Sequence, residues 1–272
     1  MKRLLERIEE LQKEIAKAGP LNAEQKRKLD LKIRLEFNYN SNHIEGNTLT
    51  YGETELLLIQ GKTQGNHDIR EYEELTAHDQ AFKQIQEYAE DKERDLTEVE
   101  IKNLNRVLLI RPFWKEAQTA GGEPTRREIT PGNYKQYPNS VRLATGEMHH
   151  YASPEETPAK MKDLMEWLNQ TIREGELSVP EIAALFHYKF VCIHPFDDGN
   201  GRIARLLMNY ILLRYNYAVV IIKSKDKSRY LDALQRADAG FTDVFIEYIL
   251  EQLIWSLELK FRAANSESLE EF

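Results

Sequence analysis

The stretch HPFDDGNGRIAR, His194 to Arg205, gathers more chemically active side chains than any other part of this 272-residue chain. It contains an imidazole, two adjacent carboxylates, a turn with two glycines, and two arginines. Gly199 and Gly201 allow the main chain to approach an anion closely and to point its N–H groups at it. A helix that begins near Arg202 would add the positive end of its dipole. The stretch therefore predicts a loop that binds phosphate.

The spacing within this stretch indicates which side chains could bind phosphate, bind a metal ion or accept a proton. Arg202 and Arg205 lie three residues apart, on one face of the predicted helix, so that two forked cations could hold successive phosphates. Asp198 offers a hard oxygen ligand for a Mg²⁺ ion that bridges two phosphates. His194 could accept a proton near neutral pH. A polar loop between two buried helices would explain any one of these residues alone, but the joint order argues against that alternative.

In this order the residues resemble the signature of the Fic family, and every position of the pattern is matched from His194 to Arg205. The resemblance implies an all-α helical bundle with a small β-hairpin flap over the active site. It also implies that the protein binds ATP with Mg²⁺ and transfers AMP to a hydroxyl side chain (Ser, Thr or Tyr) of a target protein. Gly201 differs from the lysine found in the Doc-like phosphotransferase branch.

The resemblance also assigns a role to each residue of the site. His194 would deprotonate the target hydroxyl, and Asp198 would hold Mg²⁺. The residues implied to bind the nucleotide are Gly199, Asn200, Gly201, Arg202, Arg205 and, where family members contact the base, Tyr230. Family members often form homodimers, although the sequence shows no interface.

A second motif lies far upstream, where Ser41-Asn42-His43-Ile44-Glu45-Gly46 resembles the inhibitory motif of many Fic proteins. Ser41 and Glu45 are four residues apart and share a helical face, and Gly46 is a natural residue for ending the helix. The resemblance implies that Glu45 pairs with Arg205 and keeps ATP from a productive pose. The alternative is an ordinary carboxylate in the last turn of a solvated helix.

Three functions therefore stand beside one another. The first is an autoinhibited protein adenylyltransferase restrained by Glu45. In the second, Glu45 positions a water molecule and the same site removes AMP from modified proteins. The third is a non-catalytic helical module that senses ATP, which would need neither the base His194 nor the carboxylate of Asp198.

Composition excludes other classes of function. The net charge of −8 and the absence of a long basic stripe in the sequence give no support for binding to nucleic acid or to an anionic membrane. No apolar run reaches spanning length, and the charged amino terminus does not resemble a secretory signal. Cys192 is the only cysteine, and its apolar surroundings predict a buried thiol in a reducing compartment. We expect a cytoplasmic protein.

Helical periodicity dominates the chain. Apolar residues at Leu4, Ile8, Leu11 and Ile15, followed by Gly19-Pro20, predict a helical hairpin into a second helix over 22–45. Further helices are expected over 68–90, after Thr97 and from Ser178 to Ile193, the last two with capping boxes. We divide the chain into a helical region carrying the inhibitory helix (1–100), a catalytic core (101–225), and carboxyl-terminal helices with a polar tail (226–272).

One region, 121–158, lacks helical character. Arg126 to Thr130 and Val141 to Leu143 are strand-like, and Ala144 to Glu147 form a turn before Met148 to Tyr151. We interpret the region as a β-hairpin flap whose edge could pair with an extended segment of the target. A surface loop that only packs over the core is the alternative. His187, seven residues before His194, is interpreted as a core histidine.

Overall fold

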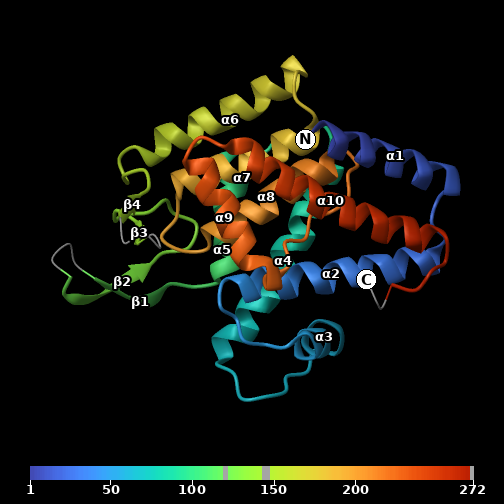
Figure 1. The fold of residues 1–272 in the computed structure, drawn as a ribbon. Helices are drawn as coiled ribbons and strands as arrows, with labels where there is room; N and C mark the ends of the chain where they lie inside the picture. The colour runs from blue at the N-terminus through green and yellow to red at the C-terminus, as the bar shows by residue number, and fades with distance from the viewer. Residues whose placement is uncertain (119–121, 143–147, 270–272) are drawn as a thin grey trace.

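A computed structural model describes residues 1–118, 122–142 and 148–269 of the chain. Within these ranges the protein is built of ten helices and two short hairpins (Figure 1). The helices are α1 (Lys2–Ala18), α2 (Ala23–Ile44), α3 (Tyr51–Gln60), α4 (Ile69–Glu90), α5 (Glu98–Leu109), α6 (Thr157–Glu174), α7 (Val179–Ile193), α8 (Asn200–Arg214), α9 (Lys227–Asp238) and α10 (Thr242–Ala264), with a 3₁₀ turn, η1 (Ser224–Asp226). The strands are β1 (Phe113–Gln118), β2 (Pro124–Ile129), β3 (Ser140–Arg142) and β4 (Met148–His150).

Local sequence signals explain where the helices begin and end. Gly19, with φ of 84°, ends α1, and a capping box then starts α2: the side chain of Asn22 accepts from the N–H of Gln25 at 2.9 Å, and the side chain of Gln25 accepts from the N–H of Asn22 at 2.8 Å. The capping boxes expected at the starts of α5 and α7 are also present. The two helices on either side of Gly19-Pro20 and the two capped helices are confirmed, but α1 packs against α10 rather than against α2, so the predicted helical hairpin does not form.

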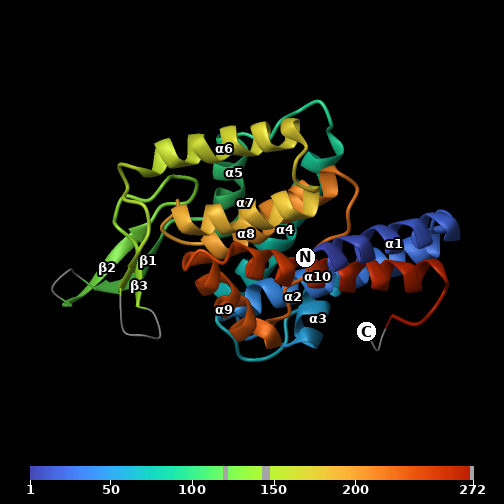
Figure 2. The same ribbon diagram turned by 45° about the horizontal axis from the view of Figure 1, so that its top comes forward.

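Helix α8 forms the centre of the molecule, and α7 and α4 pack against it. Its apolar side chains, among them Ile203, Leu206 and Leu207, are fully buried. In Figures 1 and 2, α1 and α10 lie side by side on the right, while α6 runs along the top of the molecule. None of the helices in the described ranges is both long and apolar enough to cross a membrane.

One hydrophobic core joins the three stretches into which we divided the chain. It includes Ile8 and Leu11 from α1, Phe82 from α4, and Leu253 from α10 together with the whole centre of α8. Phe37 and Ile44 of α2 belong to this core too, so the helix that ends at Glu45 packs into the same core as the loop from His194 to Arg205. Cys192 is half-buried rather than fully buried as expected, with Sγ 3.8 Å from Oδ1 of Asp238.

The non-helical region contains two hairpins where the sequence predicted one. β2 pairs with β1, which begins at Phe113, before the region assigned to the flap; β3 pairs with β4. The aromatic residues Phe113 and Trp114 favour a strand, which the division at residue 121 overlooked. Both hairpins lie at the same end of the molecule (Figures 1 and 2). The predicted turn over 144–147 lies outside the described residues.

Candidate functional site

His194 terminates α7 in a left-handed conformation, with φ of 52° and ψ of 60°. The ring of Tyr151, directly after β4, stacks on the imidazole with 4.1 Å between ring centroids. Burial, together with the positive charge of Lys135, lowers the pKa of His194 to about 4 against the opposing effects of Glu45 and Asp198. The imidazole is therefore neutral at physiological pH and able to accept a proton.

The loop after His194 is shaped by its own side chains. The amide side chain of Asn200 bonds both main-chain groups of Phe196, accepting from its N–H at 2.9 Å and donating to its carbonyl at 2.7 Å. Gly199 has φ of 81°, and a Cβ there would lie 3.1 Å from Leu108. Asn200 thus supports the loop with its side chain and contributes only main-chain N–H at the start of α8, where the first N–H groups lack helical partners.

The two arginines of the loop lie on the first turns of α8 and are nearly inaccessible, with Arg202 4% and Arg205 2% exposed. Nε and Nη1 of Arg202 make no hydrogen bond within the described residues. The nearest carboxylate, from Glu74 on α4, lies 3.5 Å from Nη1. A buried guanidinium with unsatisfied donors is costly unless an anion completes its shell. Arg202 and the start of α8 thus place unsatisfied N–H donors next to each other.

Arg205 is engaged by the end of α2. Its Nη2 donates to Oε1 of Glu45 at 2.6 Å and to the carbonyl of Ser41 at 2.9 Å, while its Nε donates to Oγ of Ser41 at 3.0 Å. Burial would raise the pKa of Glu45, but Arg205 and Arg202 outweigh it and hold that pKa below its usual value. The sequence-predicted pair is present, and its carboxylate is ionised.

The carboxylate of Glu45 also lies against the glycine turn. A Cβ built on Gly201 would lie 2.5 Å from Oε1 of Glu45 and 3.2 Å from Nη1 of Arg205. The side chain of Glu45 nevertheless remains 37% exposed. Gly46, with φ of 102°, follows it as expected for the end of the helix.

Asp198 is held on both carboxylate oxygens. Oδ1 accepts from the N–H of Gly199 at 2.6 Å, and Oδ2 accepts from Nζ of Lys115, on β1, at 3.0 Å. Burial raises the pKa of Asp198, but Lys115 and Arg202 lower it more, so the carboxylate is ionised. Lys115 is 54% exposed and stands at the oxygen that a cation would use.

A buried hydrogen-bond chain continues behind Ser41. Oγ of Ser41 lies 2.9 Å from Nε2 of His78, on α4, and Nδ1 of His78 lies 2.6 Å from the side-chain oxygen of Asn38. Asn38 donates to Asp79 at 3.1 Å. Burial, and to a smaller extent the positive charges of Arg202 and Arg205, lower the pKa of His78 well below its usual value. The ring is therefore neutral. The chain fixes Ser41 as an acceptor for Arg205.

Tyr230 lies in a place that differs from the expectation. It is 3% exposed, and its hydroxyl lies 3.1 Å from Nε2 of His187, behind Arg205 rather than open to a ligand. Tyr230 therefore supports the charged form of Arg205 from behind, and it does not line the site. His187 is completely buried, as expected of a core histidine, and burial lowers its pKa to about 3.

Sequence reasoning missed five residues that contact the site: Glu74, His78, Lys115, Lys135 and Tyr151. All five lie more than forty residues from the stretch His194 to Arg205, and none belongs to a recognisable motif. Only the strand propensity of Phe113-Trp114 could have drawn attention to the segment that carries Lys115.

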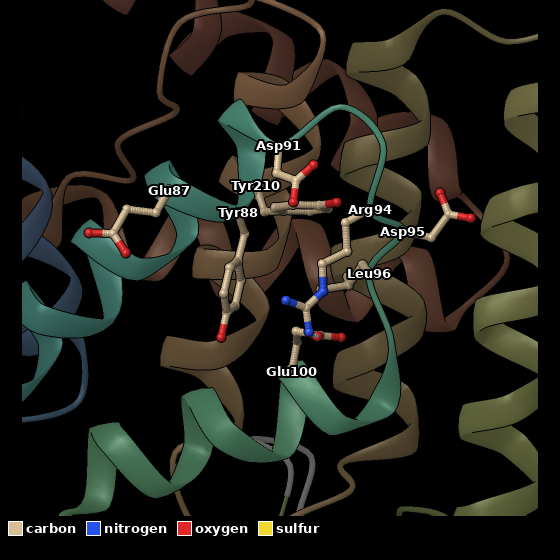
Figure 3. A pocket seen from close by; sticks show the side chains of 8 residues that line it. All are labelled: Glu87, Tyr88, Asp91, Arg94, Asp95, Leu96, Glu100 and Tyr210. Carbon is tan, nitrogen blue, oxygen red and sulfur yellow. Dashed lines mark hydrogen bonds and ion pairs between the residues drawn. The ribbon is translucent and has the colours of Figure 1, made fainter.

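A separate pocket lies at the far end of α4 (Figure 3). Four of its lining residues are acidic, but the guanidinium of Arg94 already pairs with Glu100 inside it. It lies roughly 20 Å along α4 from Glu74, at 1.5 Å per residue. It takes no part in the site around His194.

The helices thus bring a neutral histidine, a glycine turn and two buried arginines together around one loop. The model of the Fic/DOC family matches residues 68–212, and this chain belongs to that family.

The comparisons with individual proteins agree. The chain is 33% identical over 212 residues to the protein adenylyltransferase Fic of Nematostella vectensis, covering 78% of this chain and 45% of that protein. It is 30% identical over 233 residues to protein adenylyltransferase fic-1 of Caenorhabditis elegans, covering 85% of this chain and 42% of that protein. The chain thus spans less than half the length of these curated relatives.

Solved structures share the fold. A Fic domain containing signaling protein from Bacteroides thetaiotaomicron is 45% identical, with a TM-score of 0.90, covering 98% of this chain and 99% of that one. Fic-1 from Caenorhabditis elegans is 26% identical, with a TM-score of 0.76, covering 96% of this chain and 72% of that one. The expected helical fold with a β-hairpin is confirmed.

Proposed function

We propose that this protein transfers AMP from ATP to a Ser, Thr or Tyr hydroxyl of a target protein, and that Glu45 restrains the reaction. One observation supports it above the others: a neutral imidazole, His194, stands at the start of a loop that ends in the unsatisfied donors of Arg202. A general base next to an anion site is what hydroxyl attack on a phosphate requires.

The residues divide the transfer between them. His194 accepts the proton of the target hydroxyl while the hydroxyl oxygen attacks the α-phosphorus of ATP. The bond from the α-phosphorus to the bridging oxygen breaks, and pyrophosphate leaves with that electron pair. The N–H groups at the start of α8 and the guanidinium of Arg202 stabilise the charge on the phosphate oxygens. Arg205, once free of Glu45, would hold the terminal phosphate.

Asp198 is the residue that would hold Mg²⁺. The described residues contain no group of three carboxylate, histidine or cysteine side chains that could cage a metal ion. A single carboxylate is nevertheless sufficient where phosphates and water complete the shell, which is how proteins usually hold Mg²⁺ with nucleotides. Mg²⁺ would neutralise charge on the phosphate oxygens. Its binding requires Lys115 to leave Oδ2 of Asp198, and the exposed lysine can move.

The β3–β4 hairpin would present the target. Its base is attached to the loop at both ends: Asn139 donates from its side chain to the carbonyl of Phe196 at 3.0 Å, and Tyr151 stacks on His194. A two-stranded sheet leaves main-chain groups at its outer edges that an extended segment can pair with. Such pairing would place a target hydroxyl next to His194.

The proposed restraint rests on the pair between Glu45 and Arg205, because Glu45 occupies the guanidinium that would otherwise bind the terminal phosphate. The ionised carboxylate also repels phosphate oxygens next to Gly201. Nucleotide could then bind, but without its α-phosphorus facing the hydroxyl.

Incubation with ATP labelled at the α-phosphate tests the proposal. Labelling of the protein itself or of added proteins should disappear in His194→Ala and increase in Glu45→Gly. Equal labelling of His194→Ala and the unaltered protein would refute the assignment of the base.

The accessible, ionised carboxylate of Glu45 favours a second candidate, the removal of AMP from a modified protein. Glu45 would orient the attacking water, and His194, which is neutral at rest, would take up a proton first and then give it to the departing hydroxyl. Release of AMP from an AMP-modified protein, lost in Glu45→Gly, would support this direction over the first.

A further inference from the structure

Lys135 lies in the segment between the two hairpins and reaches into the turn after α7. Its main-chain N–H donates to the carbonyl of Pro195 at 2.9 Å, and its Nζ donates to the carbonyl of Ile193 at 3.1 Å. One residue therefore bonds the carbonyls on both sides of His194. Lys135 is only 3% exposed, so these bonds are protected from water.

The conformation of His194 needs such support. A non-glycine residue with φ of 52° is strained, and the proline that follows restricts His194 further. Within its own helix, His194 has one main-chain bond, from its N–H to the carbonyl of Phe190 at 3.0 Å. Strain of this kind persists only where the surroundings hold it.

The ammonium of Lys135 also acts on the charge of the imidazole. Burial lowers the pKa of Lys135 to about 8, while Asp197 and Glu156 oppose that effect, so the side chain is mostly charged at neutral pH. Lys135 in turn is the main charge that lowers the pKa of His194, against Glu45 and Asp198.

We propose that Lys135 is the positioning residue of His194: it clamps the main chain on both sides of the imidazole, so that the ring faces the target hydroxyl. The ammonium beside the ring also disfavours a second positive charge there. The proposal rests on the proposed function of His194 as the base. It assigns Lys135 no contact with ATP or with the target.

Three substitutions separate the parts of this role. Lys135→Arg retains a donor and the charge, Lys135→Gln retains a donor without the charge, and Lys135→Met removes both. Lys162→Met, on the exposed surface of α6, is the matched control. We expect kcat for AMP transfer to fall at least tenfold in Lys135→Met, with KM for ATP within about twofold, because the arginines are untouched.

Titration of His194 by NMR, without nucleotide, gives a readout independent of activity. We expect the pKa of His194 to rise by one unit or more in Lys135→Gln and Lys135→Met, and to stay near that of the unaltered protein in Lys135→Arg and Lys162→Met. The acid limb of the rate profile should shift with it.

An unchanged titration of His194 in folded Lys135→Gln would overturn the proposal. So would a loss of rate in Lys135→Met that appears only as a higher KM for ATP. If Lys135→Met does not fold, Lys135→Gln and Lys135→Arg still decide the question. If the unaltered protein transfers no AMP, the proposed function fails, whereas the titration still tests the clamp on His194.

Discussion

Replacement of Glu45 by glycine should increase AMP transfer by an amount that the structure allows us to estimate. The bond from Arg205 to Glu45 is 2.6 Å long and joins two charged groups. Such bonds contribute about 1.5–3 kcal/mol. Because the carboxylate side chain is 37% exposed, water screens it and we reduce the value to about 1–2 kcal/mol. That corresponds to a roughly five- to thirtyfold larger population of free Arg205.

The assay is the initial rate of AMP transfer at saturating ATP and Mg²⁺, with α-labelled ATP. Glu45→Gly should raise this rate roughly five- to thirtyfold, following the free-energy estimate. Glu45→Gln should raise it less, because the amide can still accept a hydrogen bond from Arg205. Glu24→Gln is the matched control: Glu24 lies on the same helix and pairs with Lys28 at 2.7 Å on the surface, far from the loop.

Two results would refute this reasoning. If Glu45→Gly and the unaltered protein transfer AMP at equal rates, the pair with Arg205 does not restrain the enzyme. If Glu24→Gln raises the rate as much as Glu45→Gly, the effect comes from loosening α2 and not from freeing the arginine.

Three further predictions concern the surroundings of the site. Ser41→Ala removes one side-chain acceptor of Arg205 and leaves Glu45 in place, so the rate of AMP transfer should rise only a few-fold. A larger rise than in Glu45→Gly would contradict the expectation that Glu45 is the main restraint. Lys115→Met should lower the Mg²⁺ concentration for half-maximal transfer by at most about fivefold, because an exposed ion pair contributes about 0–1 kcal/mol; an increased requirement would argue that the lysine assists metal binding. Between pH 7 and 5.5 the free energy of unfolding should fall by about 1 kcal/mol for each of His78 and His187, since their pKa values lie below 6.5 only in the folded protein and the unfolded chain takes up the protons first. Urea unfolding at both pH values measures the loss, and a constant stability would show that these rings bind protons as readily in the folded protein as in the unfolded chain.

Much of the site could be predicted because its chemistry is concentrated in one stretch. The residues from His194 to Arg205 lie on consecutive turns, so local rules for glycine turns and helix starts were enough to foresee an anion site. The pairing of Glu45 with Arg205 spans 160 residues and came only from the family resemblance. Nothing in the spacing along the chain would have brought those two side chains together.

The parts that were missed depend on tertiary contacts. Tyr230 belongs to a segment that resembles a base-binding region, but the amphipathic pattern of α9 turns it inward, against His187. Lys115 lies on β1, and Lys135 lies in the connection between the two hairpins. No local sequence pattern fixes how these segments pair or pack against the loop. A buried lysine next to a histidine has no sequence signature, because lysines are expected at the surface.

The packing of α2 into the central core has a consequence for how the proposed restraint by Glu45 could be lifted. Because Glu45 and Arg205 belong to one folded chain, the local concentration of the carboxylate at the guanidinium does not depend on how much protein is present. Dilution cannot relieve an inhibitor that is tethered in this way. Relief has to come from a ligand or a partner that favours a shifted last turn of α2, and that shift must also reorganise the buried contacts from Ser41 to His78.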